Sequence, residues 1–442
     1  MKQLKTIAIP LLLLLIPLFL GAELRKEDIA VHRLDNGLKI IMLEDHDIPN
    51  IAYYTFFRVG SRNERPGLTG VSHFIEHMMF NGTQKFGPGE FDRVMEASGG
   101  ANNAGTGNDT TSYTNWYPAA ALEKMIELDA DRMQSLIFDP KVLESERGVI
   151  ASERRLGVEN SNEGMLSENV QATAIMAHPY HWDVIGWMSD ILSWKRDEII
   201  DYYRTFYAPN NAVVVVVGDF QPAKILGLIK KYYGGIPKGA EPPAVNTVEP
   251  PQMGPKRIIM HKPAQTPSFQ MVYHGPAATS PDYPGLDILS IVLLQGESSR
   301  LYRRLVAEEQ LAVDVSGGLY ETIDPYLFTI SVKPKTGADL DRVEKIVEEE
   351  FDKVKTSGIA EKELQKALNT IRTNFYSPLQ TIAGKAGILG QSEILYGSYE
   401  YLFTAMDKYN AVTLKQVQDL AAKYFTENNK TVGVLIPEGG SK

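Results

Sequence analysis

Two histidines and a glutamate lie within five residues of one another, at His73, Glu76 and His77. Residues four apart on a helix share one face, so His73 and His77 can direct their imidazoles at a single point. Glu76 follows His73 by three residues and lies beside the same point. Two imidazoles and one carboxylate are the ligand set of a catalytic zinc ion that keeps one position open for water. The alternative is a helix with two surface histidines, because so short a pattern also arises by chance.

The third zinc ligand is expected to be a carboxylate from another part of the chain, because two histidines alone rarely hold zinc. The best candidate is Glu153, which lies 76 residues beyond His77 in the stretch 144–153. Glu146 precedes Glu153 by seven residues, so the two carboxylates share one helical face two turns apart.

This pattern resembles that of the pitrilysin/insulinase family of zinc peptidases, the inverted zincins of M16 type. The segments 99–104 (Gly-Gly-Ala-Asn-Asn-Ala) and 110–113 (Thr-Thr-Ser-Tyr) are also similar to the stretch between that family's two metal-binding helices. The family includes the mitochondrial processing peptidase, and the chain looks like a bacterial subunit of that kind. The resemblance implies one zinc ion per chain, held by His73, His77 and Glu153.

Glu76 lies too close to the water of such a site to be idle. We expect it to take the proton of that water, whose pKa the metal lowers from 15.7 toward roughly 7, and to return the proton to the leaving amine. The alternative for Glu76 is a solvated helix carboxylate. Glu146 has two open roles: a hydrogen bond to a ligand histidine, as carboxylates around metal sites make, or plain exposure to solvent.

A general peptidase must bind the backbone of its substrate, because peptides share few other features. An extended peptide can add as a strand to an open sheet edge. Asn103 and Ala104 occupy positions that resemble the family's edge strand in contact with substrate, so we predict that they bind peptide. Read as structure alone, Gly99-Gly100 and Asn102-Asn103 are turn residues.

The composition is that of a globular protein, with 43% hydrophobic and 23% charged residues among 442. The net charge of −10 argues against a nucleic-acid surface. The chain has no cysteine, which excludes disulfides, thiolate metal sites and an acyl anchor on Cys. Residues 1–22 are predicted to be a signal peptide, with Lys2 and Lys5 before a 14-residue apolar run at 7–20. We therefore expect a periplasmic protein without a stable membrane anchor; an uncleaved anchor is the alternative.

The mature chain mixes strand and helix patterns, so the predicted fold class is α+β. A hairpin is expected over 31–44 with Asn36-Gly37 as its two-residue turn, and strands are expected at 51–59 and 212–217. Helices are expected over 88–97, 119–136, 141–157 and 198–207. His178, His181 and Trp182 show no partner pattern, so we expect surface and packing roles for them.

A proline-rich stretch separates two halves that resemble each other. It has six prolines between 237 and 256 and no apolar periodicity, which is typical of a linker. Asp201, Asn210 and Asn211 correspond to Asp419, Asn428 and Asn429 at an offset of 218, as the segment 66–68 does to 284–286. The same offset places Ile291, Leu294 and Gln295 where the first half has its histidines and base.

We therefore predict a zinc-bearing catalytic α+β domain at 23–236, a linker at 237–256, and a degenerate α+β repeat without metal ligands at 257–442. Each half is expected to be a mostly antiparallel sheet packed with helices, the subunit layout that the resemblance also implies. The segment 298–302 is similar to a family segment of the second half and is expected to open a helix there.

The resemblance also implies an Arg and a Tyr about seven residues apart in the non-zinc half, where they clamp the bound peptide. In the second half of this chain no Arg is followed by Tyr at that distance. The resemblance implies that chains of this length work as two-subunit particles, so we expect a dimer. The missing pair favours a related subunit without zinc as the source of the clamp, and a homodimer is the alternative. The sequence thus predicts a zinc endopeptidase acting on peptides or unfolded segments outside the cytoplasm. The alternatives are a non-catalytic assembly subunit of the same fold and a metal-dependent hydrolase of non-peptide substrates.

Overall fold

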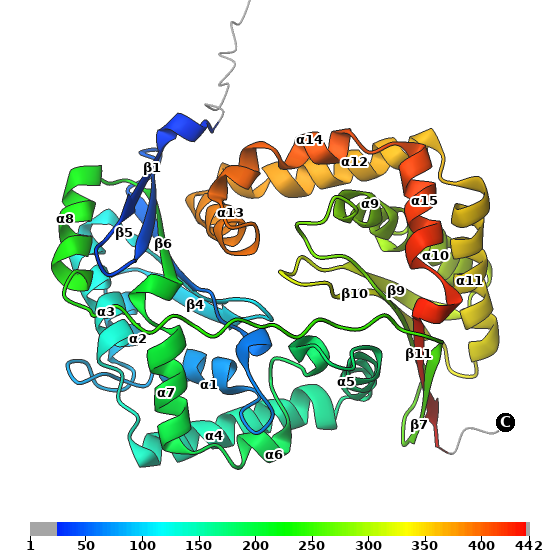
Figure 1. The fold of residues 1–442 in the computed structure, drawn as a ribbon, viewed down its shortest axis with the longest axis horizontal. Helices are drawn as coiled ribbons and strands as arrows, with labels where there is room; N and C mark the ends of the chain where they lie inside the picture. The colour runs from blue at the N-terminus through cyan, green and yellow to red at the C-terminus, as the bar shows by residue number, and fades with distance from the viewer. Residues whose placement is uncertain (1–23, 439–442) are drawn as a thin grey trace, which may run out of the picture.

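Two β-sheets lie at opposite ends of the protein, whose computed structural model describes residues 24–438 (Figure 1). The predicted signal peptide lies outside the described residues. The first sheet has the order β1-β2-β6-β3-β5-β4, and the second has the order β7-β11-β8-β10-β9. The strands of the first sheet are β1 (Ile29–Arg33), β2 (Lys39–Glu44), β3 (Asn50–Phe57), β4 (Ala101–Thr106), β5 (Thr111–Pro118) and β6 (Ala212–Gly218). Those of the second are β7 (Lys256–Lys262), β8 (Ser268–His274), β9 (Ala312–Leu319), β10 (Leu327–Pro334) and β11 (Lys430–Pro437).

Each sheet is antiparallel except for one parallel pair, β2 with β6 and β7 with β11. The valine run of β6 is fully buried, as a continuous β-branched stretch in the middle of a sheet requires. The predicted α+β class with two mostly antiparallel sheets is confirmed.

Each sheet is covered on one face by helices from its own half. The first carries α1 (Val71–Met78), α2 (Glu90–Ala97), α3 (Leu122–Gln134), α4 (Pro140–Arg154), α7 (Arg196–Phe206) and α8 (Pro222–Tyr233). The second carries α9 (Tyr283–Leu294), α10 (Arg300–Tyr302), α11 (Leu340–Ser357), α12 (Glu361–Tyr376), α14 (Ala405–Asn410) and α15 (Leu414–Tyr424). A short helix, α6 (Met188–Ile191), packs beside α4. The helices expected over 88–97, 119–136, 141–157 and 198–207 correspond to α2, α3, α4 and α7.

The opposite face of each sheet is covered by a helix from the other half. Helix α13 (Ile382–Leu395) packs its apolar side chains on β3 and β6 of the first sheet. Helix α5 (Asn162–Ala174) packs on β8 and β11 of the second sheet. Figure 1 shows α13 in orange beside β6, and α5 in green beside the second sheet. The division into domains at 23–236 and 257–442 stays a prediction. Helices α5 and α13 each pack on the sheet of the other half.

The contact of α13 with the first sheet depends on a glycine. A Cβ on Gly390 would lie 2.0 Å from the ring of Phe56, so we expect Gly390→Ala to lower the free energy of unfolding by about 1–3 kcal/mol. Gly387 lies on the same helix, and a Cβ at that position would meet no atom within 4 Å. Gly387→Ala should therefore raise stability by about 0.5–1 kcal/mol. Urea midpoints of the two variants measure this contrast. Equal midpoints would show that α13 does not pack closely on the sheet.

The predicted repeat is visible in equivalent hydrogen bonds. Asn211 precedes β6 and donates through Nδ2 to the carbonyl of Phe206 at 2.7 Å. Asn429 precedes β11 and donates in the same way to Tyr424, also at 2.7 Å. Each Asn makes a second such bond to the neighbouring antiparallel segment, at Arg58 or His274. The pairs 211/429 and 206/424 both keep the offset of 218, so the two halves share this strand-opening device.

The predicted hairpin of β1 and β2 is confirmed, but the prediction of a two-residue turn is wrong. Leu34 N–H donates to Leu38 at 3.0 Å and encloses a three-residue loop, Asp35 to Gly37. The N–H of Gly37 donates to the Leu34 carbonyl and closes a tight turn. Gly37 itself has a φ of +94°, in the left-handed region. That arrangement is the usual one for a three-residue hairpin loop. The side chain of Asn36 is held by the carbonyls of Tyr233 and Ile236, at the end of α8.

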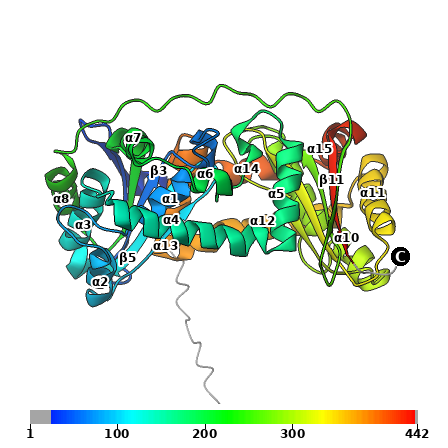
Figure 2. The same cartoon turned by 90° about the horizontal axis from the view of Figure 1, so that it is seen from below.

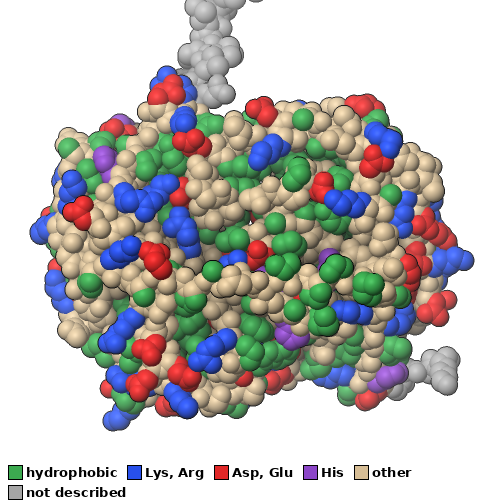
Figure 3. Space-filling view, viewed as in Figure 1, with side chains coloured by type: hydrophobic (Ala, Val, Ile, Leu, Met, Phe, Trp, Pro, Cys, Tyr) green, Lys and Arg blue, Asp and Glu red, His purple; other side chains and the backbone are tan. Residues whose placement is uncertain are grey.

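The stretch between α8 and β7 carries no helix or strand and crosses one face of the protein from the first sheet to the second (Figure 2). The carboxylate of Glu249 fixes it by accepting three backbone N–H groups, from Met176, Ala177 and His178 at 2.8–2.9 Å. Across the face shown in Figure 3, basic and acidic side chains are interspersed. Within 24–438 no helix is long and apolar enough to cross a membrane.

His178 and Trp182 are buried, and His178 contacts the second half. His178 Nε2 lies 3.0 Å from Asp324 of the second half, and Trp182 Nε1 donates to the Ser61 carbonyl at 3.0 Å. His181 is partly exposed and hydrogen bonds to the Ile175 carbonyl. The packing roles expected for these residues agree with these contacts, although His178 is not at the surface.

Candidate metal centre

Helix α1 carries the pattern His-x-x-Glu-His, and its opposite side is anchored in the first core. Val71, Phe74, Ile75 and Met78 are fully buried under the sheet. Because these apolar residues are three or four apart, they fix the rotation of the helix about its axis. His73 and His77 therefore lie together on a half-buried side, with their ring centroids 4.7 Å apart.

The segment that leads into α1 is held by two carboxylates that sequence reasoning missed. Glu64 is 5% exposed and accepts the N–H groups of Gly70 and Ser72 at 2.7 and 2.8 Å, so it caps the start of the helix. Burial raises the pKa of Glu64 to about 8, against the lowering effect of these two N–H groups. Asp190 accepts the N–H groups of Gly67 and Thr69 in the same segment. No periodic pattern marks such contacts, because they depend on the path of a loop.

His73, His77 and Glu153 come together at one point. Glu153 Oε2 lies 3.8 Å from His73 Nε2 and 3.7 Å from His77 Nε2. In the part of the chain that the structure describes, these three residues form the one group of histidines and carboxylates close enough to hold a metal ion. Glu153 is supplied by α4, which packs beside α1. The donors match the two-histidine, one-carboxylate set of catalytic zinc sites.

Glu146 contacts His77 and does not join the ligand group. Its Oε1 lies 2.8 Å from His77 Nδ1, and its Oε2 accepts from Asn81 at 3.0 Å. A carboxylate on Nδ1 leaves Nε2, the atom that faces Glu153, free to bind metal. Of the two roles left open for Glu146, the geometry matches the hydrogen bond to a ligand histidine. His73 differs, because its Nδ1 is buried and has no hydrogen-bond partner within 24–438.

The two histidines are electrostatically different. Burial and the neighbouring His77 lower the pKa of His73 to about 4, so its imidazole is neutral and able to bind a metal. Burial also lowers the pKa of His77, but the hydrogen bond to Glu146 and nearby carboxylates outweigh it and raise the pKa. The pKa of Glu146 is correspondingly lowered by His77. Burial raises the pKa of Glu76, and its hydrogen bond with Thr106 partly opposes this.

Asn103 and Ala104 lie on β4, the last strand of the first sheet. β4 pairs with β5 on one side, and no strand within 24–438 pairs with its other edge. The turn alternative for Asn102-Asn103 is therefore wrong, since both residues are in the strand. α1 packs beside β4, so the unpaired edge lies close to the helix that carries the metal ligands.

Beyond β4 a cavity of about 570 Å³ opens between the two halves. It begins at Gly107, directly after the strand, and reaches β8 and β10 of the second sheet. The carboxylates of Asp109, Asp183 and Glu321 line it, and no Lys or Arg among the described residues does.

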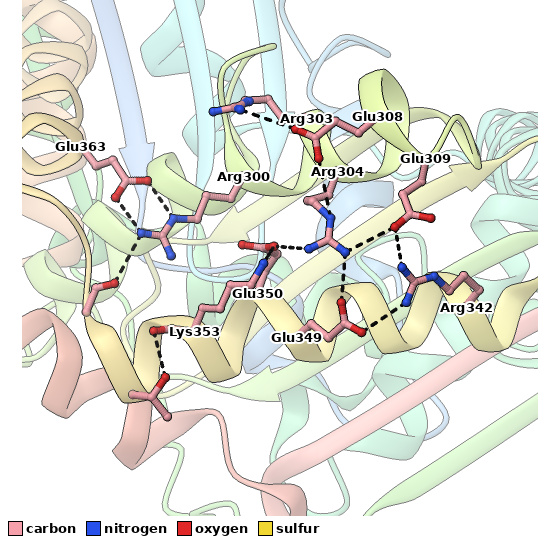
Figure 4. Close-up of polar contacts among 12 residues, drawn as sticks. Arg300, Arg303, Arg304, Glu308, Glu309, Arg342, Glu349, Glu350, Lys353 and Glu363 are labelled. Carbon is pink, nitrogen blue, oxygen red and sulfur yellow. Dashed lines mark hydrogen bonds and ion pairs between the residues drawn. The ribbon is translucent and has the colours of Figure 1, made fainter.

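The second half has no counterpart to the metal centre among the described residues. Ile291 and Leu294 are buried in α9, and Gln295 is exposed at its end. The predicted helix at 298–302 is present as α10, which continues into a wider turn at 303–308. Arg300 pairs with Glu363 through two 2.7 Å hydrogen bonds, and Arg304 pairs with Glu349 and Glu350 (Figure 4). These arginines thus fix α10 on α11 and α12.

The helix-borne histidines, a carboxylate from a second helix and a free sheet edge define a metallopeptidase-type architecture. Residues 39–186 match the family described as Insulinase (Peptidase family M16), and residues 193–371 match the Peptidase M16 inactive domain. The chain is 32% identical to the zinc protease PqqE of Helicobacter pylori, over 91% of this chain and 92% of that protein. It is 24% identical to the uncharacterized zinc protease YmxG of Bacillus subtilis, over 91% and 97%. The chain therefore belongs to the M16 family of zinc proteases.

Solved structures share this fold. A protease from Helicobacter pylori superposes with a TM-score of 0.89 at 30% identity, covering 92% of this chain and 99% of that one. A peptidase M16 inactive domain from Pseudomonas fluorescens shares the fold with a TM-score of 0.85 at 18% identity, covering 94% and 100%. The periplasmic protease PqqL of Escherichia coli shares it at 0.76 and 18%, covering 94% of this chain and 48% of that one.

Proposed function

We propose that the protein is a zinc-dependent endopeptidase that hydrolyses peptides or unfolded segments outside the cytoplasm. The observation that carries this proposal is the grouping of His73, His77 and Glu153 beside the edge of β4 that no described strand pairs with. Glu76 lies between this group and β4. A metal site alone would serve many hydrolases. The adjoining edge favours a substrate with an extended peptide backbone.

The substrate is expected to add to β4 as a further strand. Main-chain hydrogen bonds along Asn103 and Ala104 would hold it, so binding would depend little on side chains. Most extended strands of a folded protein are already paired, and exposed edges are usually blunted against further pairing, so peptides and unfolded segments are the preferred class. The cavity beyond Thr106 gives the same peptide room to continue toward the second half.

The three ligands would hold zinc, which would polarise the scissile carbonyl and make a water molecule more acidic. Glu76 would accept the proton of the attacking water and deliver it to the amine that leaves. Glu146 would keep the His77 ring in the orientation that presents Nε2.

The proposed compartment is the periplasm. The apolar segment at 7–20 after two lysines supports export, and the related PqqL is described as a periplasmic protease. Fractionation of cells that produce the full chain, followed by N-terminal sequencing of the mature protein, tests this location.

The test of function is digestion of an unfolded protein and of the same protein folded, with and without a zinc chelator. We expect cleavage of the unfolded form alone, its loss on chelation, and its return with added Zn²⁺. Hydrolysis of small esters without peptide cleavage would point to a non-peptide hydrolase. Protein that carries no zinc as purified, and that cleaves nothing even after Zn²⁺ is added, would favour the non-catalytic assembly role that the inactive-domain match of the second half leaves open.

The proposed assembly is a dimer with a related subunit that lacks the zinc ligands and carries an Arg/Tyr clamp. In support, the arginines of α10 and its continuation are engaged in ion pairs within their own half. The lone chain should then cleave peptides poorly and gain activity when a zinc-less relative from the same genome is added. Full activity of a homodimer, identified by light scattering, would contradict the hetero-partner.

A further inference from the structure

Thr106 connects the expected general base to the substrate edge. Its Oγ1 donates a 2.6 Å hydrogen bond to Oε2 of Glu76. Thr106 is the last residue of β4, and Glu76 lies on α1 between the two ligand histidines. The contact therefore links the strand expected to bind peptide to the group expected to move the proton.

This hydroxyl is the one hydrogen-bond partner of the Glu76 side chain within residues 24–438. The terminal torsion of a glutamate is broad and roughly two-fold, so an unheld carboxylate samples many orientations. A hydrogen bond on Oε2 removes that freedom and leaves Oε1 to accept a proton. Proton transfer needs donor and acceptor within hydrogen-bond reach, so the orientation of this carboxylate affects the rate.

Thr106 is itself fixed with respect to α1. It pairs with Thr111 of β5, whose hydroxyl lies 3.2 Å from the Tyr207 hydroxyl. Tyr207 in turn donates to the Ser72 carbonyl of α1 at 3.1 Å. These contacts connect Thr106, through Thr111 and Tyr207, to the helix that carries Glu76. Thr111 and Tyr207 are buried. Strand and helix therefore cannot shift independently.

We propose that Thr106 is a positioning residue, whose hydroxyl fixes the Glu76 carboxylate in the orientation needed for proton transfer at the edge of β4. This inference rests on the proposed peptidase function. It assigns Thr106 no contact with the reacting atoms. Its role differs from that of Asn103 and Ala104, which would bind the peptide backbone.

The test compares Thr106→Val, which keeps the shape of the side chain, with Thr106→Ser, which keeps the hydroxyl. With the zinc-loaded full chain and a peptide substrate, we expect Thr106→Val to lower kcat about tenfold, as loss of a hydrogen bond to a charged group does. KM should stay within about twofold, because the hydroxyl does not bind the peptide. Thr106→Ser should recover kcat to within about threefold of the wild type.

A matched control is Thr205→Val, which removes an exposed hydroxyl bonded to its own helix at Asp201 and should leave kcat unchanged. Zinc content and melting temperature are measured for every variant. Wild-type kcat in Thr106→Val, a change confined to KM, or failure of Ser to restore what Val loses would each overturn the inference. If Val lowers the melting temperature, the comparison of Thr106→Ala with Thr106→Ser decides on the same criteria. A wild-type chain without zinc-dependent turnover, both alone and with the zinc-less relative added, would instead refute the proposed function.

Discussion

Glu76→Gln is expected to retain zinc and the melting temperature of the wild type while kcat falls by at least roughly 10²-fold. The amide keeps the size of the side chain and can still accept the hydrogen bond from Thr106. It cannot take up a proton at neutral pH, so the hydrolysis would lose its base. Turnover of an unfolded peptide by the zinc-loaded protein, measured together with metal content, checks this result.

The matched control for this change is Glu96→Gln on α2, which alters an exposed glutamate on another helix of the first half. It should leave kcat, zinc content and stability as they are. A Glu76→Gln enzyme that turns over at the wild-type rate would sink the proposed mechanism, even with the ligands correctly assigned.

The second large effect is on metal binding. Changing His73, His77 or Glu153 to Ala should abolish the one zinc per chain that survives dialysis in the wild type, because each change removes a direct ligand. Glu146→Ala should keep the site but weaken its zinc affinity by roughly 10–100-fold, as loss of a carboxylate behind a ligand histidine does. Metal analysis after dialysis against graded chelator concentrations separates these two outcomes.

Glu144→Ala provides the control on the same helix. Its side chain is 66% exposed and pairs with Arg147, away from the ligands. Zinc affinity should therefore be unchanged. Full zinc in Glu153→Ala combined with its loss from Glu146→Ala would reverse the ligand assignment.

The parts of the site that could be predicted from sequence are those that depend on local helical geometry. His73, Glu76 and His77 lie within two turns of α1, so their spacing fixes their common side. The prediction of Glu153 as a ligand depends on a spacing of 76 residues from His77, which has meaning only through the family resemblance. Asn103 and Ala104 were placed on an edge strand by the same resemblance, against a local preference for a turn.

What sequence reasoning missed lies in contacts between segments with no fixed spacing. Thr106 reaches Glu76 because β4 ends beside α1, which only the packed strand reveals. Glu64 caps the zinc helix through a loop, and loops carry no periodicity. In the hairpin, Asn36-Gly37 favours a two-residue turn, but the loop has three residues. Gly37 instead adopts its positive φ directly after a tight turn. The side chain of Asn36 donates to the carbonyls of Tyr233 and Ile236.

Helices α5 and α13, each packed on the sheet of the other half, have a consequence for how the chain folds. Arg58 hydrogen bonds to Glu393 across 335 positions, so one face of the first sheet stays uncovered until nearly the whole chain has been synthesised. Contacts so distant in sequence slow folding, because loop closure precedes the gain from burial. The growing chain would expose the apolar face of β3 and β6 in the meantime, which invites aggregation. Docking of the C-terminal segment from α13 onward therefore completes the cover of the first sheet, and a chain that stops short of α13 is expected to expose that apolar face to chaperones and proteases.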